Sequence, residues 1–318
     1  MRCLLLHPMV GLLCLSGMKI FVTGATGFIG YAVASELARA GHDVFGLSRN
    51  AGNSKRLAAA GVATVTGAMS DPHSYAGAAK ECQVLIHCAA EYSEKYMELD
   101  RRTVEALLRS AQDSRLPRLV IYTSGCWVYG NTGRTGADES TPLNPPAMVQ
   151  PRVATEGLVI EANRDLVRTV ILRPGCVYGG SGSLTASWFE SAVKEGAARI
   201  VGDGAFRWTM VHLADLAQAY RLSAESSLGG EIFNVTDRSR STVLECAQAV
   251  SFAVNGNETV NSTSLEEAVK IMGPMVDCLT LDQHVDSSKA SRLLGWQPRH
   301  GGFADGAGRY YGSWKAAQ

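Results

Sequence analysis

Three glycines at intervals of three residues, Gly24, Gly27 and Gly30, follow a short apolar run near the start of the chain. Glycine permits a tight turn at the first position, approach of a pyrophosphate at the second, and close helix–strand packing at the third. A helix beginning after this loop would present free N–H groups and partial positive charge to the anion. The spacing predicts a dinucleotide-binding site whose phosphate loop comprises Gly24, Thr26, Gly27, Phe28, Ile29 and Gly30.

The segment from Leu47 to Asn50 stands where such a site contacts the adenine ribose. An acidic residue there would accept hydrogen bonds from a free 2′-hydroxyl and would repel a 2′-phosphate. The chain carries instead the hydroxyl of Ser48 and the guanidinium of Arg49, which suit a phosphate through charge-assisted bonds. The alternative is that Arg49 is a solvated loop residue. The sequence therefore favours NADP over NAD.

Further segments give the chain a resemblance to the extended short-chain dehydrogenase/reductase family, also called the NAD-dependent epimerase/dehydratases. The glycine loop has that family's G-x-x-G-x-x-G spacing, and the resemblance covers nearly everything from Met18 onward. The other matching segments are H-C-A-A at 87–90, T-S at 123–124, V-Y-G at 128–130, R-P-G-C-V-Y-G at 173–179, V-H-L-A-D at 211–215, F-N-V at 233–235 and L-G-W-Q-P at 294–298.

The resemblance implies cofactor contacts beyond the glycine loop. Asp71 matches a position that contacts the adenine in that family, and the segment 87–90 matches a turn beside the nicotinamide ribose. The further cofactor-binding residues expected on this basis are Ser48, Arg49, Met69, Asp71, His87, Ala89, Ala90, Arg152, Pro174 and Val177. Family members also commonly form homodimers, through helices that correspond here to residues 98–114 and 151–163.

The catalytic pattern of that family breaks in this chain. The usual proton donor is a tyrosine four residues before a lysine, a spacing that puts both groups on one helix face. If Glu156 is the glutamate that often follows the lysine, Arg152 takes the lysine's place and Met148 the tyrosine's. No tyrosine or lysine occurs between Gly130 and Val177, so the usual pair is absent.

Part of the missing role is expected to survive in other residues. Arg152 can hold ribose hydroxyls and keep positive charge near the site, although a guanidinium with a pKa above ~12 is a poor proton donor. Pro151 favours a helix beginning near that residue, which leaves Met148 on the incoming loop. Ser124, after a strand, can orient a carbonyl or hydroxyl oxygen. Glu156 is expected to form an i,i+4 ion pair with Arg152 rather than to act as a base.

Two tyrosines are candidate replacement acids. They are Tyr92, on the loop after the segment 87–90, and Tyr178; packing or loop anchoring is the alternative for each. Tyr129 is expected to be structural. From its residue type His212 is expected to titrate near neutrality, and it either orders its segment or contacts substrate.

Alternating strands and helices must position these residues. Expected strands lie at 20–23, 43–48, 63–66, 84–87, 119–123 and 169–172, and expected helices at 29–40, 54–60, 98–114 and 184–195. This order predicts an α/β fold with a doubly wound parallel sheet of the Rossmann type. Clustered glycines after residue 180 suggest a smaller lobe. We therefore divide the chain into an N-terminal extension at 1–17, a dinucleotide-binding domain at 18–180, and a substrate lobe at 181–318 that is interleaved with the sheet.

Composition excludes several classes of function. The 318 residues carry 30 basic and 30 acidic side chains, and no basic stripe suggests nucleic-acid binding. The eight cysteines include no C-x-x-C pair and no zinc-ligand spacing, so we expect no metal, reduced thiols and a cytoplasmic location. Residues 1–17 have some features of a signal peptide, but His7 and Pro8 break the apolar run and favour an extension before a start at Met18. No other stretch approaches the ~20 apolar residues of a membrane span.

The leading functional hypothesis is an NADP-dependent oxidoreductase that uses a non-standard proton donor. Its substrate would be a small, largely uncharged carbonyl, alcohol or activated alkene, with Trp127 and Trp188 as candidate apolar walls. Beyond Arg207 no basic cluster suits a nucleotide-sugar pyrophosphate. Two alternatives remain: a non-redox isomerase, cyclase or lyase on the same fold, and a catalytically silent regulatory protein that binds NADP.

Overall fold

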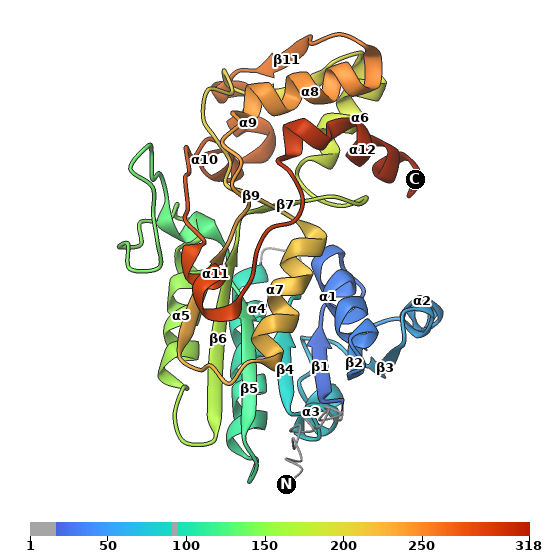
Figure 1. The fold of residues 1–318 in the computed structure, drawn as a ribbon, viewed down its shortest axis with the longest axis vertical. Helices are drawn as coiled ribbons and strands as arrows, with labels where there is room; N and C mark the ends of the chain where they lie inside the picture. Colours follow the sequence, from blue (N-terminus) through green and yellow to red (C-terminus); the bar gives the residue numbers. More distant parts are fainter. Residues whose placement is uncertain (1–16, 91–94) are drawn as a thin grey trace, which may run out of the picture.

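The computed structural model describes residues 17–90 and 95–318 (Figure 1). In these ranges seven parallel strands form one sheet, in the order β3-β2-β1-β4-β5-β6-β10. The strands are β1 (Lys19–Thr23), β2 (Asp43–Ser48), β3 (Val62–Thr66), β4 (Val84–His87), β5 (Arg118–Thr123), β6 (Val167–Pro174) and β10 (Glu231–Val235). The predicted α/β fold with a Rossmann-type parallel sheet is confirmed.

Helices cover both faces of this sheet, because the strands bury side chains on both sides. One face carries α1 (Phe28–Arg39), α2 (Ser54–Ala59), α7 (Leu213–Glu225) and α11 (Ser288–Leu294). The other carries α3 (His73–Lys80), α4 (Tyr96–Gln112) and α5 (Gln150–Glu161). Along β1, Ile20 and Val22 join the first core and Phe21 the second, as the period of two requires. Figure 1 shows α1 and α7 in front of the sheet.

A smaller lobe lies above the carboxyl ends of the strands in Figure 1. It contains two pairs of parallel strands, β7 (Cys176–Tyr178) with β9 (Met210–His212) and β8 (Ala198–Val201) with β11 (Val260–Thr263). Its helices are α6 (Ala186–Glu195), α8 (Val243–Asn255), α9 (Leu265–Met272), α10 (Met275–Leu279) and α12 (Phe303–Lys315). Its core is rich in aromatic side chains, namely Tyr178, Trp188, Phe189, Phe303, Tyr310 and Trp314.

Two short 3-10 helices complete the described elements, η1 (Ala51–Asn53) and η2 (Cys126–Tyr129). Helix α3 was not predicted, since it is short and its sequence contains Gly77. Helix α4 begins at Tyr96, two residues before the predicted start, and this brings a tyrosine into the first turn of the helix. None of the described helices is both long enough and apolar enough to cross a membrane.

Candidate active site

A cavity of about 320 Å³ lies at the carboxyl ends of β1, β2 and β4. In open α/β sheets this edge is where ligands bind. Its lining residues are Gly24, Thr26, Gly27, Phe28, Ile29, Leu47, Arg49, Gly67, Ala68, Met69, Cys88, Ala89 and Ala90. The structure thus brings most of the predicted phosphate loop together with Arg49, Met69, Ala89 and Ala90 in one groove.

The glycines of the loop leave no room for side chains. Gly24 has a φ of +71°, and a Cβ there would lie 2.6 Å from the Cα of Ala89. A Cβ on Gly30 would lie 2.1 Å from the carbonyl oxygen of Gly24. Gly27 caps α1 without a side chain, and the first turn of that helix carries no acidic residue. This end of α1 therefore offers N–H groups and positive potential to a pyrophosphate, which fits a dinucleotide.

Seven of the predicted cofactor residues are not among those that line the groove: Gly30, Ser48, Asp71, His87, Arg152, Pro174 and Val177. The hydroxyl of Ser48 donates to the carbonyl oxygen of Asn50 at 2.9 Å, so it shapes the turn after β2. Asp71 is exposed, and its carboxylate accepts from the N–H of His73 at 3.2 Å. Both side chains thus form local turn contacts and are not among the groove-lining residues.

His87 is buried inside the sheet. Its Nδ1 lies 2.6 Å from the hydroxyl of Thr23, and its Nε2 lies 3.2 Å from a carboxylate oxygen of Asp100. The hydroxyl of Tyr122 donates to the other oxygen of Asp100 at 2.7 Å. This network ties the start of α4 to β1, β4 and β5, and it assigns His87 a structural role.

Ser124 follows β5, the strand next to β4, at the same edge of the sheet. Its side chain is 7% exposed, and its hydroxyl oxygen has no hydrogen-bond partner in the described protein. A buried hydroxyl left unpaired costs about 1–3 kcal/mol. An oxygen atom of a ligand would supply the missing partner.

Arg152 lies in the first turn of α5 and reaches across to β5. Its Nη1 donates to the carbonyl oxygen of Thr123 at 2.8 Å, and its Nη2 donates to the phenol oxygen of Tyr96. Burial acts to lower the pKa of Arg152, but its neighbours Tyr122, Tyr96 and the carboxylate of Asp100 raise it above the ordinary value. The guanidinium is therefore a fixed positive charge. It is bonded to the residue that precedes Ser124 in the chain.

The predicted ion pair between Arg152 and Glu156 is wrong. Glu156 binds Arg173 of β6 through two hydrogen bonds, of 2.9 and 2.5 Å, and both side chains are buried. Arg173 also donates to the hydroxyl of Tyr129 at 2.7 Å, so Tyr129 is structural as predicted. The helix places Glu156 toward the sheet, where the guanidinium of Arg173 offers a bidentate partner.

The remaining catalytic candidates are placed as follows. Met148 precedes α5, which begins at Gln150, and packs beside Trp127 in a small apolar cluster. The hydroxyl of Tyr178 is placed to donate to the carboxylate of Asp237 at 3.0 Å and to a backbone carbonyl oxygen at 2.8 Å. Tyr92 lies outside the described residues. Tyr96 was not among the predicted site residues. Its position one helical turn before Asp100 was the sequence feature that could have indicated it.

His212 caps α7 and has an ordering role. Its Nδ1 accepts from the N–H of Ala214 at 3.2 Å, and its ring stacks on His300 with centroids 3.6 Å apart. Asp215 completes a group whose ligand atoms lie within 4.8 Å of one another. The carboxylate of Asp215 already accepts from the backbone of Arg299 and His300 and contacts the ring of His300. These hydrogen bonds explain the cluster of His212, Asp215 and His300 as a structural cap at the start of α7.

We predict that the variant His212→Asn loses less stability than the wild type when the pH is lowered. Burial, followed by the nearby His300, lowers the pKa of His212 to about 4, whereas an unfolded histidine titrates near about 6.5. Because the unfolded chain takes up the proton first, stability falls as pH drops from about 6.5 toward 4. Asparagine keeps the cap. Thermal unfolding at pH 7 and pH 4.5 should therefore show a smaller difference in Tm for the variant than for the wild type.

The control for this prediction is His73→Asn, which changes an exposed histidine at the start of α3. This variant should keep the wild-type difference in Tm between the two pH values. An equal difference in His212→Asn and in the wild type contradicts the titration assigned to His212.

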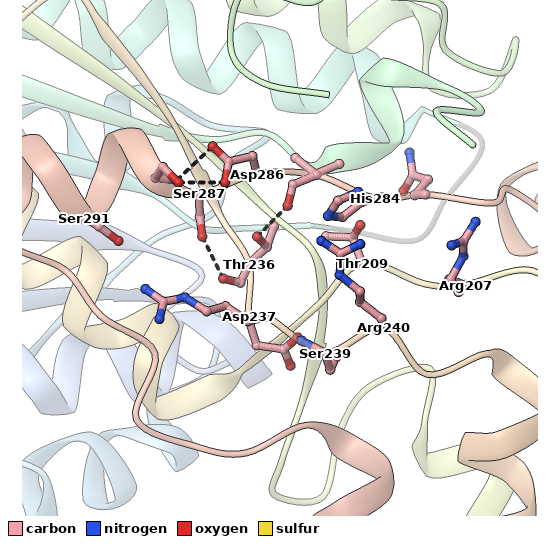
Figure 2. Close-up of a pocket in the computed structure, with 14 residues that line it drawn as sticks. Arg207, Thr209, Thr236, Asp237, Ser239, Arg240, His284, Asp286, Ser287 and Ser291 are labelled. Carbon is pink, nitrogen blue, oxygen red and sulfur yellow. Dashed lines mark hydrogen bonds between the residues drawn. The ribbon is translucent and has the colours of Figure 1, made fainter. Parts of the chain in front are cut away.

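A second cavity of about 320 Å³ lies between residues 236–240 and 283–291 (Figure 2). Figure 2 shows Arg207, Arg240 and His284 gathered at one end and Asp286 with Ser287 at the other. Arg207 is held by Asp282 at 2.8 and 2.5 Å. Because that ion pair offsets its charge, Arg207 is a weak candidate for binding a pyrophosphate.

Trp188 does not form a wall of a substrate pocket. It is 3% exposed and stacks on Trp208, with ring centroids 5.1 Å apart, inside the smaller lobe. Its aromatic neighbours bury it in the core of that lobe, which is where tryptophans are more often found. Trp127, by contrast, is half-buried and comes directly after the turn at Gly125.

Comparison with known proteins gives a consistent result. The model of the NAD dependent epimerase/dehydratase family matches residues 20–236. An uncharacterized protein of Schizosaccharomyces pombe is 30% identical over 289 residues, which is 89% of this chain and 96% of that protein. The 4-hydroxy-2-methyl-3-oxo-4-farnesyl-3,4-dihydroquinoline-1-oxide ketoreductase of Stigmatella aurantiaca is 28% identical and covers 69% of this chain and 68% of its own.

Solved structures show the same fold. The dTDP-glucose 4,6-dehydratase of Bacillus anthracis, in complex with NAD, superposes with a TM-score of 0.80 over 94% of this chain and 97% of its own. The two sequences are 19% identical, so this similarity concerns the fold alone.

Proposed function

The chain belongs to the NAD dependent epimerase/dehydratase family, and from that premise we propose that it is an NADP-dependent oxidoreductase acting on a small, largely uncharged carbonyl, alcohol or activated alkene. The observation that carries the proposal is the buried, unpartnered hydroxyl of Ser124 at the edge of the sheet that holds the nucleotide groove. NADPH bound in that groove supplies a hydride. The hydroxyl of Ser124 donates a hydrogen bond to the substrate oxygen and orients it.

The surroundings of Ser124 favour an uncharged substrate. Trp127 and Met148 pack against one apolar cluster, and part of that cluster follows Ser124 closely in the chain. The charge of Arg207 is offset by Asp282. The ketoreductase from Stigmatella aurantiaca supports oxidoreductase chemistry on an apolar substrate, since its name includes a farnesyl group.

The preference for NADP rests on Arg49. This residue lines the groove directly after β2, where the adenine ribose is expected. No carboxylate stands among the groove-lining residues to repel a 2′-phosphate. A guanidinium at this position favours the phosphorylated cofactor.

We also propose that the enzyme works in the cytoplasm as a homodimer. The six described cysteines are free, which fits a reducing compartment. Helices α4 and α5 pack side by side on one face of the sheet, and Ile160 of α5 is 46% exposed there. The mass of the assembly in solution, measured by light scattering, tests the dimer.

The proposed function predicts a large loss of activity in Ser124→Ala. Consumption of NADPH is followed at 340 nm with a panel of aldehydes, ketones and activated alkenes. Removing one donor aimed at a reacting oxygen lowers kcat by roughly 10²-fold or more. The Tm should be equal to that of the wild type or higher, because the hydroxyl makes no hydrogen bond with the described residues and its burial costs free energy.

The matched control is Ser110→Ala, a buried serine whose hydroxyl bonds the carbonyl of Ala106 within α4. It should retain wild-type turnover. Undiminished turnover by Ser124→Ala contradicts the role of this hydroxyl. Substrate conversion without an absorbance change points to the non-redox alternative, and tight NADPH binding without any turnover points to a regulatory protein.

A further inference from the structure

We propose that Tyr96, held by Arg152, is the acid that protonates the substrate oxygen, replacing the tyrosine that is missing at position 148. This inference rests on the proposed function. In the reduction, the carbonyl carbon accepts the hydride and its π electron pair moves to the oxygen. That oxygen takes the proton of the Tyr96 hydroxyl, and the resulting phenolate is reprotonated from water.

The contact between Arg152 and Tyr96 has a defined direction. A guanidinium has only donors, so the phenol oxygen accepts the hydrogen bond from Nη2. This contact therefore does not use the phenol's proton. The guanidinium of Arg152 also lies 5.7 Å from the centre of the Tyr96 ring, close enough for a cation–π attraction.

Arg152 also places Tyr96 near Ser124. Its Nη1 is fixed on the carbonyl oxygen of Thr123, the residue before Ser124 in the chain. One guanidinium thus spans the end of β5 and the phenol. The guanidinium therefore links the residue before Ser124, whose hydroxyl is proposed to orient the substrate oxygen, to the phenol that is proposed to protonate it.

The start of α4 is held firmly against the sheet. Asp100 lies four residues after Tyr96, on the same face of the helix. Burial acts to raise the pKa of Asp100, but the hydrogen bond from His87 lowers it below the ordinary value, so the carboxylate stays charged. Its bonds to His87 and Tyr122 fix the first turns of α4 and so the position of Tyr96.

The positive charge of Arg152 favours the phenolate that the reaction produces, whereas the carboxylate of Asp100, one helical turn away, opposes it. Negative charge on Tyr96 contributes to raising the pKa of Arg152, although burial acts against it. Because the attraction is mutual, the charge of Arg152 stabilises a phenolate on Tyr96. Arg152 thereby supplies the electrostatic part of the role that the resemblance gives to a lysine.

Two further described tyrosines, Tyr122 and Tyr220, lie near this edge of the sheet. The hydroxyl of Tyr122 donates to Asp100, and that of Tyr220 lies 2.5 Å from the hydroxyl of Thr123. Both side chains are fully buried. Tyr96 is only half-buried, so a substrate can approach this residue more readily than either of the other two.

The test compares the wild type with Tyr96→Phe. With a substrate that the wild type reduces, we expect kcat to fall by roughly 10²- to 10⁴-fold, the usual contribution of a positioned acid. The Kd for NADPH and the KM should stay unchanged. The fall of kcat at high pH, which reports loss of the acidic proton, should be present in the wild type and absent in the variant. Tyr311→Phe, which changes a half-buried tyrosine of α12 in the smaller lobe, is the control and should behave as the wild type.

A second measurement needs no substrate. Phenolate absorbance at 295 nm is titrated in the wild type, Tyr96→Phe and Arg152→Met. The step that disappears in Tyr96→Phe should move to higher pH in Arg152→Met, because the positive charge that stabilises the phenolate is removed. If the wild type reduces nothing, the proposed function fails while this titration still reports on the pair. Normal turnover by Tyr96→Phe, or a step that stays at the same pH in Arg152→Met, overturns the inference.

Discussion

Replacing Glu156 with alanine should lower the free energy of unfolding by about 3–5 kcal/mol, the loss typical of breaking a buried ion pair. The side chains of Glu156 and Arg173 are 2% and 3% exposed, and the carboxylate takes both ends of the guanidinium. Without Glu156 the positive charge of Arg173 stays buried, and among the described residues the hydroxyl of Tyr129 is the side-chain acceptor that its Nη1 retains. The cost arises from this uncompensated charge.

Urea unfolding measures the effect. The control is Glu195→Ala, since the ion pair between Glu195 and Arg199 is exposed on both sides and exposed pairs contribute only about 0–1 kcal/mol. Replacing Glu156 and Arg173 together by leucine should cost less than the single change, because no charge then remains buried. A loss below about 1 kcal/mol in Glu156→Ala contradicts the structural role assigned to this pair.

Replacing Arg49 with glutamate should reverse the preference between the two cofactors. Arg49 lines the nucleotide groove after β2, where an acidic residue would accept hydrogen bonds from a free 2′-hydroxyl. A hydrogen bond to a charged group contributes about 1.5–3 kcal/mol, so loss of the guanidinium alone should raise the Kd for NADPH by roughly 10- to 100-fold. Repulsion by the new carboxylate adds to this increase, and the Kd for NADH should stay equal or fall.

Fluorescence titration of both cofactors measures these constants at fixed ionic strength. Arg39→Glu is the control, because Arg39 is exposed in the last turn of α1 and pairs with Glu36. It should leave the ratio of the two Kd values unchanged. Equal weakening of both cofactors by Arg49→Glu, or tighter binding of NADH by the wild type, contradicts the NADP assignment.

Patterns within single elements were enough to predict most of the sheet and the glycine loop. The strands are short apolar runs, and Gly24 and Gly30 stand where any side chain would meet backbone atoms. Helix α3 escaped prediction because it is short and contains Gly77. Sequence patterns were therefore sufficient to predict features that depend on residues close together in the chain.

The candidate site depended on contacts between distant elements, and there the predictions were less complete. The i,i+4 spacing of Arg152 and Glu156 suggested a pair, but the tertiary structure offers Glu156 a bidentate partner on β6. Tyr96 and Arg152 are 56 residues apart, so nothing in the sequence pattern links them. Their meeting requires α4 and α5 to lie side by side.

Transfer of deuterium from NADPH labelled at the hydride position tests the central claim most directly. The wild-type enzyme is incubated with the labelled cofactor and the panel of carbonyl compounds and activated alkenes, and products are analysed by mass spectrometry. An NADP-dependent oxidoreductase transfers one deuterium, from one face of the nicotinamide, to the reduced carbon of a product. Products without deuterium, or no product across a broad panel despite tight NADPH binding, contradict the proposed function.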